Sequence, residues 1–335
     1  MPPIDGVVTA VQNPEAITAG VQSPEMQPLI SASPAIDEIR SRIGLIARSE
    51  ASVLITGESG SGKEVVARMI HRAGQRARYP FVAVNCAAMP REVIDNELFG
   101  HEREAFTGAA SKRAGCFELA HRGTLFLDEI TEMPPQSQAK LLRAIESKSF
   151  RRLGGKEEVS VDVRIVAATN RDVRHALKGG DLREDLYYRL SVIELHVPPL
   201  RDRKEDIPLL AGHFFRIFAE KYGSAQKQFS PQALEALQSY PWPGNIRELK
   251  NLVERTVLVC PDLNVDASHL PERFVARQVQ EDALRIPLGT SLEECSRLLI
   301  LRTLDLCDGN KSKAAAILGI SRKALYDRLR SYRAV

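Results

Sequence analysis

Between residues 35 and 200, short apolar runs alternate with longer segments of helical periodicity. The apolar runs are VLITG (53–57), FVAVNC (81–86), TLFLDE (124–129), VRIVAATN (163–170) and VIELHVP (192–198). The helical segments follow at 63–73, 90–99, 136–147 and 183–190. Nearly continuous apolar strands that alternate with helices are typical of a parallel sheet covered on both faces. The pattern therefore predicts a doubly wound α/β domain.

The rest of the chain divides by composition and period. Its start is rich in Pro, Gln, Ala and Gly, which favours a flexible leader. Residues after about 200 have helical periodicity, interrupted at SYPWPGN (239–245), and a stretch with Pro and Asp follows. We expect five parts: a leader (1–28), an α/β subdomain (29–200), an all-helical lid (201–262), a linker (263–290) and a helical terminal module (291–335).

Composition limits the class of protein. The 335 residues are 44% hydrophobic and 27% charged, as in ordinary globular proteins. No stretch approaches the roughly 20 apolar residues of a membrane span, and the N-terminus has no basic start with an apolar segment after it. The five cysteines form no C-x-x-C pair, so we expect reduced thiols in a cytoplasmic protein with no membrane association.

Charge is concentrated at the C-terminus. From residue 296 onward there are nine basic and three acidic residues, a net charge of +6, although the whole chain carries only +3. A basic terminal module on a mildly acidic body indicates binding to nucleic acid or another polyanion. Charge alone is equally compatible with a solvated helical face.

A phosphate-binding loop is predicted at GESGSGK (57–63), because G-x-x-x-x-G-K here follows a strand and opens a helix. Its residues are Gly57, Glu58, Ser59, Gly60, Ser61, Gly62 and Lys63. The glycines allow backbone N–H groups to surround phosphates, and the lysine reaches the β- and γ-phosphates. Glu64 stands where Ser or Thr would ligate Mg²⁺, so it either holds the ion less directly or leaves it to other carboxylates.

Three polar residues follow two further strands. Asp128 and Glu129 end LFLDE, and Asn170 ends the next strand. At the carboxyl edge of the sheet, Asp128 would hold Mg²⁺ and Glu129 would polarise the attacking water. Asn170 would position the water or sense the γ-phosphate, or else it is a plain turn residue.

Two arginines and one phenylalanine suggest contacts outside the subunit. Arg183 and Arg189 lie in DLREDLYYRL and are candidates for arginines supplied in trans, the alternative being an ordinary salt-bridged helix. Phe106 lies in HEREAFTGAA, beside small residues that favour a loop. An exposed Phe in a loop indicates a binding contact, and the alternative is a residue of the core.

The last forty residues read as three helices. In GNKSKAAAILGISRKALYDRLRSY, Gly319 permits a tight turn and Ser321 is placed to cap the last helix. This spacing predicts a helix-turn-helix, a generic helical hairpin being the alternative. The residues expected to contact DNA are Ser321, Arg322, Lys323, Tyr326, Arg328 and Arg330. Leu298, Leu299, Leu301 and Leu304 are candidates for burial against a second copy.

These motifs together resemble the AAA+ ATPases that activate bacterial sigma-54 RNA polymerase, the enhancer-binding proteins. The matching stretches are GESGSGKE, FVAVNCAA, ELFGHEREAFTGA, GTLFLDEI, ATN, LREDLYYRL and YPWPGNIRELKN, in order over about residues 35 to 255. The C-terminal module resembles the Fis-like DNA-binding end of the same family. The resemblance implies a doubly wound P-loop AAA+ ATPase with a small all-α lid, acting as a ring, usually a hexamer.

The resemblance also assigns roles to residues. Asn85 matches the asparagine that restrains the catalytic glutamate, and Arg247 in the lid matches a second sensor. Glu64 matches the family, in which Glu usually follows the phosphate-loop lysine. Asn170 resembles the first sensor, and Arg183 and Arg189 the trans arginines.

In the family, a Gly-Ala-Phe-Thr-Gly-Ala loop contacts the sigma factor when ATP drives its movement. Here this loop comprises Glu104, Ala105, Phe106, Thr107, Gly108 and Ala109. Its first glycine is replaced by Glu104, which changes the backbone freedom at the base of the loop and adds a negative charge.

We therefore expect an activator that binds enhancer DNA, uses ATP and Mg²⁺, assembles from dimers to a hexamer and remodels the sigma-54 holoenzyme. The leader is too short for a receiver domain, so control would come from a separate regulatory protein, a paralogue in a mixed ring, or expression level. A DNA-binding repressor or co-subunit that uses ATP mainly for assembly is the alternative, and Glu104 is its main support. A helicase-loader-like ATPase is disfavoured by the loop and the helix-turn-helix.

Overall fold

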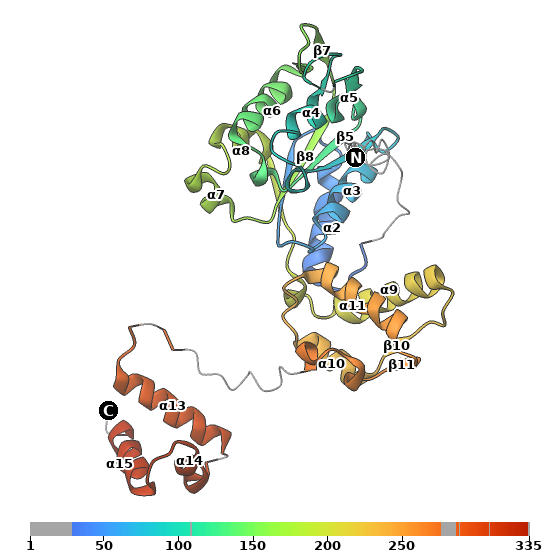
Figure 1. The fold of residues 1–335 in the computed structure, drawn as a ribbon. Helices are drawn as coiled ribbons and strands as arrows, with labels where there is room; N and C mark the ends of the chain where they lie inside the picture. Colours follow the sequence, from blue (N-terminus) through green and yellow to red (C-terminus); the bar gives the residue numbers. More distant parts are fainter. Residues whose placement is uncertain (1–28, 108, 276–285, 288, 308, 334–335) are drawn as a thin grey trace, which may run out of the picture. The chain divides into compact units, whose positions relative to one another are not determined.

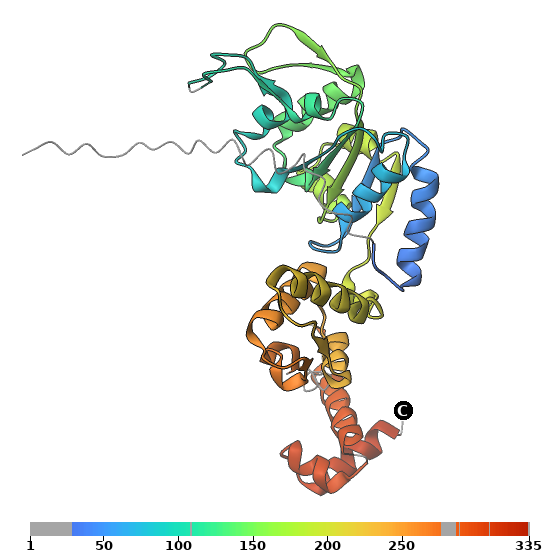
Figure 2. The same cartoon turned by 90° about the vertical axis from the view of Figure 1, so that its right-hand side faces the viewer.

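The computed structural model describes residues 29–107, 109–275, 286–287, 289–307 and 309–333. The chain divides into two compact units, one ending at Pro271 and the next beginning at Glu272, and each unit is described by itself (Figures 1 and 2). The leader expected at 1–28 lies outside the described residues, as do residues 276–285 and 288 of the linker expected at 263–290.

A five-stranded parallel sheet forms the centre of the first unit, in the order β2-β5-β8-β1-β9. All five predicted strands are present: β1 (Val53–Thr56), β2 (Phe81–Asn85), β5 (Thr124–Asp128), β8 (Arg164–Thr169) and β9 (Ile193–His196). Because the chain crosses over between neighbouring parallel strands, their carboxyl ends meet at one edge. The doubly wound α/β prediction is confirmed.

Alternate side chains of the strands pack in two separate hydrophobic cores, one on each face of the sheet. Leu54 packs in the core that includes helices α4 (Ile94–Phe99), α6 (Pro135–Ser147) and α8 (Glu184–Leu190). Its neighbours Val53 and Ile55 pack in the core of the opposite face, with helices α2 (Pro34–Ile46) and α3 (Lys63–Ala73). Since successive side chains of a strand point to opposite faces, a strand apolar throughout must be covered on both.

Several elements differ from the prediction. The helix expected at 90–99 begins only at Ile94, and α2 and α7 (Val173–Gly179) were not predicted. The sequence also gave no signal for two antiparallel strand pairs: β3 (Gly100–His101) with β4 (Arg113–Ala114), and β6 (Ser149–Arg151) with β7 (Glu158–Ser160). Strands of two or three residues are too short to show a period of two.

The lid contains the predicted helices and a small strand pair. Helices α9 (Asp206–Tyr222), α10 (Pro231–Ser239) and α11 (Asn245–Val259) form its body. The parallel pair of β10 (Gln228–Phe229) with β11 (Asn264–Val265) corrects the expectation of helices alone. Because Val265 is fully buried beyond the expected boundary at 262, the lid extends into the region expected to be linker.

The second unit ends in the three predicted helices, α13 (Leu292–Leu306), α14 (Lys311–Ile317) and α15 (Arg322–Arg333). Its small core is made by Ile300, Cys307, Ala314, Ala315 and Leu325. Gly319 adopts φ +66° in the turn before α15, a conformation that glycine takes without steric cost.

The remaining short elements connect these parts. They are η1 (Cys86–Ala88), α5 (Cys116–Leu119), η2 (Ile130–Glu132), η3 (Leu200–Asp202), η4 (Ala267–His269) and α12 (Glu272–Val275). Among the described residues, no helix combines the length and the apolar character that a membrane crossing requires.

A buried histidine makes the stability of the first unit depend on pH. His71 of α3 bonds Thr124 of β5 (Nδ1 to Oγ1, 2.9 Å), and burial, followed by the charge of Arg72, lowers its pKa below the ordinary value of 6.5. The unfolded chain therefore takes up the proton first, so the free energy of unfolding falls as pH drops below about 6.5 and levels off below the folded-state pKa.

We predict that His71→Gln removes this part of the pH dependence, because Gln retains hydrogen-bonding groups but does not titrate. Urea denaturation at several pH values, followed by circular dichroism, measures it. Equal pH slopes for the variant and the wild type below about pH 6.5 would contradict the prediction.

Candidate functional site

The loop Gly57–Lys63 joins β1 to α3 at the carboxyl edge of the sheet. Gly60 and Gly62 have φ of +75° and +107°, which bends the backbone around a central space. The Nζ of Lys63 donates to the carbonyls of Gly57 (2.9 Å) and Glu58 (3.3 Å). The lysine is thus folded back over its own loop, with its charge held where phosphates bind in loops of this kind.

Glu129 joins the loop to two neighbouring strands. Its Oε1 lies 3.4 Å from the Nζ of Lys63, and its Oε2 accepts the backbone N–H of Asn170 at 2.8 Å. The residue is buried and has φ +54°, a left-handed conformation that is uncommon for residues other than glycine. The structure thus brings Lys63, Glu129 and Asn170 together as predicted, although Asn170 bonds through its backbone and not its side chain.

The residues around Asp128 fit a divalent cation. The Oδ1 of Asp128 is a buried oxygen without a hydrogen-bond partner among the described residues. Burial, followed by the charge of Glu129, raises the pKa of Asp128 above its ordinary value. A bound cation would satisfy this oxygen and favour the charged form of the carboxylate. Glu64 instead pairs with Arg68 one turn along α3, at 2.7 Å.

Asn85 lies beside Asp128 in the sheet but is bonded elsewhere. The register of β2 and β5 pairs these two residues. The Oδ1 of Asn85 accepts the backbone N–H groups of Ala87 (2.9 Å) and Ala88 (3.2 Å), and so caps η1. In the described part of the chain, the recorded partners of the Glu129 carboxylate are Lys63 and Asn170. The restraining bond implied for Asn85 is therefore not made in this conformation.

The lid contacts the phosphate loop through the start of α11. Arg247 donates to the Oγ of Ser59 at 2.9 Å, which places this predicted sensor on the loop. The backbone N–H of Ile246 donates to the carbonyl of Gly60 at 3.0 Å. A Cβ on Gly60 would lie 2.6 Å from the carbonyl oxygen of Gly244, so this close approach requires glycine.

Two residues of this contact were missed by the sequence reasoning. The Nδ2 of Asn245, which is fully buried, donates to the Glu58 carboxylate and to the Ser59 carbonyl, each at 3.0 Å. Arg201 forms an ion pair with Glu58 at 2.6 Å and is the main reason that the pKa of Glu58 is lowered. The only available signal for Asn245 was its position after a Pro-Gly turn, where Asn tolerates the observed φ of +50°.

The two candidate trans arginines are exposed: Arg189 lies in α8 and Arg183 immediately precedes it. Arg183 pairs with Asp185 at 2.8 Å. This geometry agrees with either alternative from the sequence, since an arginine acting in trans must also face away from its own subunit.

The candidate contact loop lies between the β3 and β4 strands. The N–H of Glu104 donates to the carbonyl of Ala109 at 2.9 Å, and Glu104 has φ +64°. Phe106 is 47% exposed and meets the edge of His101, while Ala109 is buried. Phe106 is therefore not a core residue. Gly108 lies outside the described residues.

The segment between β6 and β7 packs on the base of this loop. The N–H of Leu153 donates to the carbonyl of Gly100 (2.9 Å), and the N–H of Glu102 donates to that of Leu153 (3.0 Å). Arg152 bridges the carboxylates of Glu102 and Glu118. Two insertions far apart in the sequence are thus held together by backbone and charged contacts.

The predicted DNA-contacting residues share the exposed surface of α15 and the turn before it. The Oγ of Ser321 accepts the N–H of Ala324 at 3.1 Å, which confirms the predicted cap. The exposed side chains are those of Arg322, Lys323, Tyr326, Arg328 and Arg330. Leu298, Leu299 and Leu301 of α13 are exposed, whereas Leu304 packs on the core of its own unit, contrary to expectation.

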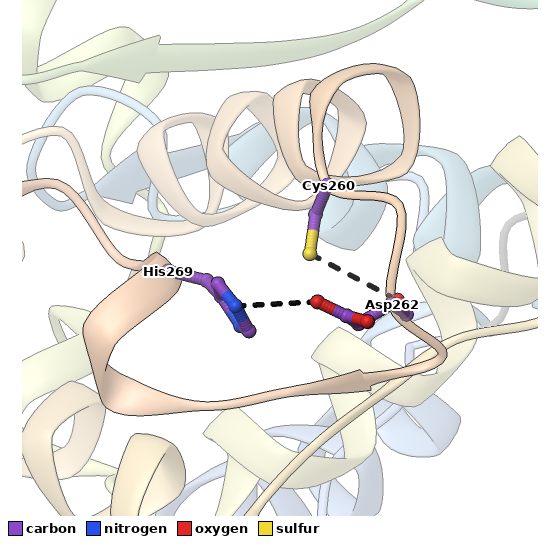
Figure 3. Close-up of side chains that lie close together, drawn as sticks. All are labelled: Cys260, Asp262 and His269. Atoms are coloured by element: carbon purple, nitrogen blue, oxygen red, sulfur yellow. Dashed lines mark hydrogen bonds and ion pairs between the residues drawn. The ribbon is translucent and has the colours of Figure 1, made fainter.

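A thiol, a carboxylate and an imidazole gather after α11, at Cys260, Asp262 and His269 (Figure 3). The Nε2 of His269 lies 3.3 Å from a carboxylate oxygen of Asp262, and its Nδ1 accepts the N–H of Asp266 at 3.1 Å. Because the accepting Nδ1 carries no proton, the proton of the neutral ring lies on Nε2, the nitrogen that faces Asp262. The arrangement is a closed hydrogen-bonded contact and not a prepared metal site.

A phosphate loop that a helical lid contacts at the edge of a parallel sheet defines a P-loop ATPase of the AAA+ class. Models of three families match the chain: "Sigma-54 interaction domain" at residues 29–196, "AAA+ ATPase lid domain" at 201–286 and "Bacterial regulatory protein, Fis family" at 291–332. The chain belongs to the sigma-54-dependent transcriptional activators, the bacterial enhancer-binding proteins.

Individual relatives support this assignment. The chain is 47% identical to the transcriptional regulatory protein ZraR of Escherichia coli K12, over 90% of this chain and 68% of that protein. It is 44% identical to the response regulator protein PilR of Pseudomonas aeruginosa, over 97% and 73%. Crystal structures of NtrX from Brucella abortus are also similar. The complex with ADP has a TM-score of 0.69 at 38% identity, covering 91% of this chain and 68% of that one.

We predict that Glu104→Gly raises the free energy of unfolding of the first unit by about 0.5–1 kcal/mol, because glycine adopts positive φ without steric cost. The Glu104 side chain is 81% exposed and forms an ion pair with Arg103. Glu104→Ala is the matched control, since it removes the charge but keeps the Cβ, and it should give no gain. Urea denaturation measures both, and an equal gain from Ala would assign the effect to charge.

Proposed function

We propose that this protein hydrolyses ATP to remodel the closed complex of sigma-54 RNA polymerase into an open complex through the loop Glu104–Ala109. The observation that carries the proposal is a connected set of contacts from the phosphate lysine to the base of that loop. The similar NtrX of Brucella abortus has been crystallised in complex with ADP and with ATP, which supports ATP as the nucleotide.

The residues of the sheet edge divide the chemical work. Lys63 and the backbone of the phosphate loop bind the phosphates, and Asp128 would hold Mg²⁺. When bound, the ion neutralises the charge of the phosphate oxygens. Glu129 orients the attacking water and accepts its proton, since its carboxylate stands at the end of β5 beside Lys63. Phosphate binding draws Lys63 toward the nucleotide and releases one contact of Glu129.

Completion of the site requires a second subunit. Arg189 in α8 and Arg183 immediately before it are exposed, so we assign them to the nucleotide of a neighbouring subunit, where cationic groups stabilise the charge of the transferred phosphoryl group. This arrangement closes into a ring, which we propose to be a hexamer. Asn85 would bond Glu129 in a conformation other than the present one.

Movement reaches the loop through β8. Glu129 bonds Asn170, which directly follows β8, and the β6–β7 strand pair directly precedes β8. Arg152 and Leu153, in the segment between those two strands, bond Glu102 and Gly100 at the base of the loop. A change in the hold on Glu129 is therefore transmitted to Phe106, whose exposed ring is an apolar anchor for the sigma factor.

The second unit supplies the DNA contacts. We propose that α15 enters the major groove of enhancer DNA and that two copies bind paired half-sites. The exposed leucines 298, 299 and 301 of α13 are the surface that we assign to this dimer. A repressor or co-subunit that uses ATP only for assembly is the second candidate, favoured by the strained Glu104 at the loop base.

We predict that the wild-type protein forms open complexes with sigma-54 holoenzyme on a sigma-54 promoter only when ATP is present. Phe106→Ala should hydrolyse ATP at the wild-type rate but form no open complexes. Glu129→Gln should bind ATP but hydrolyse it at least about 100-fold more slowly than the wild type, as expected on loss of a general base. Permanganate footprinting and phosphate release measure the two activities.

Leu45→Ala is the matched control for Phe106→Ala, because Leu45 is an equally apolar, 73% exposed residue on α2. It should retain both activities. Wild-type protein that hydrolyses ATP steadily without forming open complexes would contradict the activator proposal and favour the second candidate.

A further inference from the structure

A buried charged pair lies between the start of the described chain and the phosphate loop. Arg203 and Asp206 are 1% and 0% exposed, and the Nη1 of Arg203 is 3.9 Å from the Oδ2 of Asp206. Burial lowers the pKa of Arg203, and Asp206 opposes that shift. Buried charges are stable only when hydrogen bonds satisfy them, so the partners of each group determine what the pair does.

The partners of Asp206 come from the segment Ser31–Ser33. The hydroxyl of Ser31 lies 2.7 Å from each carboxylate oxygen, and the N–H groups of Ala32 (2.7 Å) and Ser33 (3.1 Å) donate to Oδ1. These contacts join residues more than 170 positions apart in the sequence. They satisfy most of the carboxylate without Arg203, which explains why the charged pair stays as far apart as 3.9 Å.

Arg203, in turn, supports the phosphate loop. Its Nη2 donates to the backbone carbonyl of Ser61, and its Nε is a buried donor without a partner among the described residues. The carbonyl of Ser61 belongs to the turn whose neighbours Gly60 and Gly62 have positive φ. An anchor at this carbonyl helps to hold the loop in the shape that receives phosphates.

We propose that Arg203 and Asp206 are positioning residues that make the shape of the phosphate loop depend on whether Ser31–Ser33 is seated. When the segment leaves, Asp206 loses its donors, and the nearest charged donor is Arg203. The guanidinium then turns to the carboxylate, releases the carbonyl of Ser61, and the loop loses its anchor. Nucleotide affinity is thereby controlled by whatever holds or displaces the segment that precedes α2. This inference rests on the proposed binding of ATP at this loop.

The test is the equilibrium affinity of the full-length protein for a non-hydrolysable ATP analogue, adenosine 5′-(β,γ-imido)triphosphate with Mg²⁺. Ser31→Ala and Arg203→Met should each weaken binding by about tenfold, the effect of one charge-assisted hydrogen bond. Because both act through the same anchor, the double variant should be no weaker than Arg203→Met alone. Additive effects would overturn the relay and place Ser31 in direct contact with the nucleotide, and unchanged affinity in both single variants would also overturn it.

Two further variants separate positioning from folding. Arg203→Lys keeps a buried cation near Asp206 but reaches less far, so it should fold and still bind the analogue more weakly than the wild type. Glu254→Gln removes an exposed ion pair of the lid with Lys221 and should leave affinity unchanged. Loss of thermal stability in Arg203→Lys with unchanged affinity would reduce Arg203 to a purely structural residue.

The design distinguishes this inference from the proposed function. Analogue binding requires neither hydrolysis nor sigma-54. If the effects of the Ser31 and Arg203 variants are non-additive but the protein forms no open complexes, the proposed link from Ser31 to the phosphate loop is supported and the activator function is contradicted. If the effects are additive and the protein forms open complexes, only the link from Ser31 to the phosphate loop is contradicted. Failure of the wild type to bind the analogue overturns both.

Discussion

The buried carboxylate of Glu129 is the constraint on which the rest of the site depends. A carboxylate at this depth needs donors, and it finds them in the lysine of the phosphate loop after β1 and the backbone amide that follows β8. Strand β8 lies between β5 and β1 and pairs with both. Glu129, which follows β5 in a left-handed conformation, can therefore bond the residue after β8 and the lysine after β1. In the proposed mechanism, nucleotide binding at Lys63 therefore acts on the strand that continues from the β6–β7 insertion.

Residues outside the phosphate loop hold it in its shape through hydrogen bonds and an ion pair. Several of its backbone and side-chain groups find their partners in η3, the turn after it and the start of α11. The residues that bond the loop are Asn245, Ile246, Arg201 and Arg203. A flexible, glycine-containing loop gains a defined shape when the partners of its polar groups are fixed elsewhere. The position of the lid therefore determines whether the loop has the shape that binds phosphate.

The sequence was sufficient for the parts of this protein that rest on local patterns. The five buried strands, the loop at Gly57–Lys63 and the cap at Ser321 follow from apolar runs, glycine spacing and capping chemistry. Contacts that depend on tertiary placement were not visible: Asn245 on the loop, and Asp206 beneath Ser31–Ser33. The bond implied for Asn85 is absent because its side chain caps η1 instead, a local choice of partner that a pattern of residues does not specify. Glu104 illustrates the same limit, since its unusual residue type was evident but its φ of +64° was not.

Amide hydrogen exchange, compared between the nucleotide-free protein and the protein with ADP, aluminium fluoride and Mg²⁺, tests the coupling of nucleotide to loop most directly. Exchange reports local opening, and nucleotide-dependent elements belong to the less stable parts of a fold. The account predicts that residues 100–114 and 149–160 change their exchange together with the phosphate loop, and that Arg152→Ala uncouples the first two regions from the loop. Changes confined to residues 57–64 and 128–129 would contradict it.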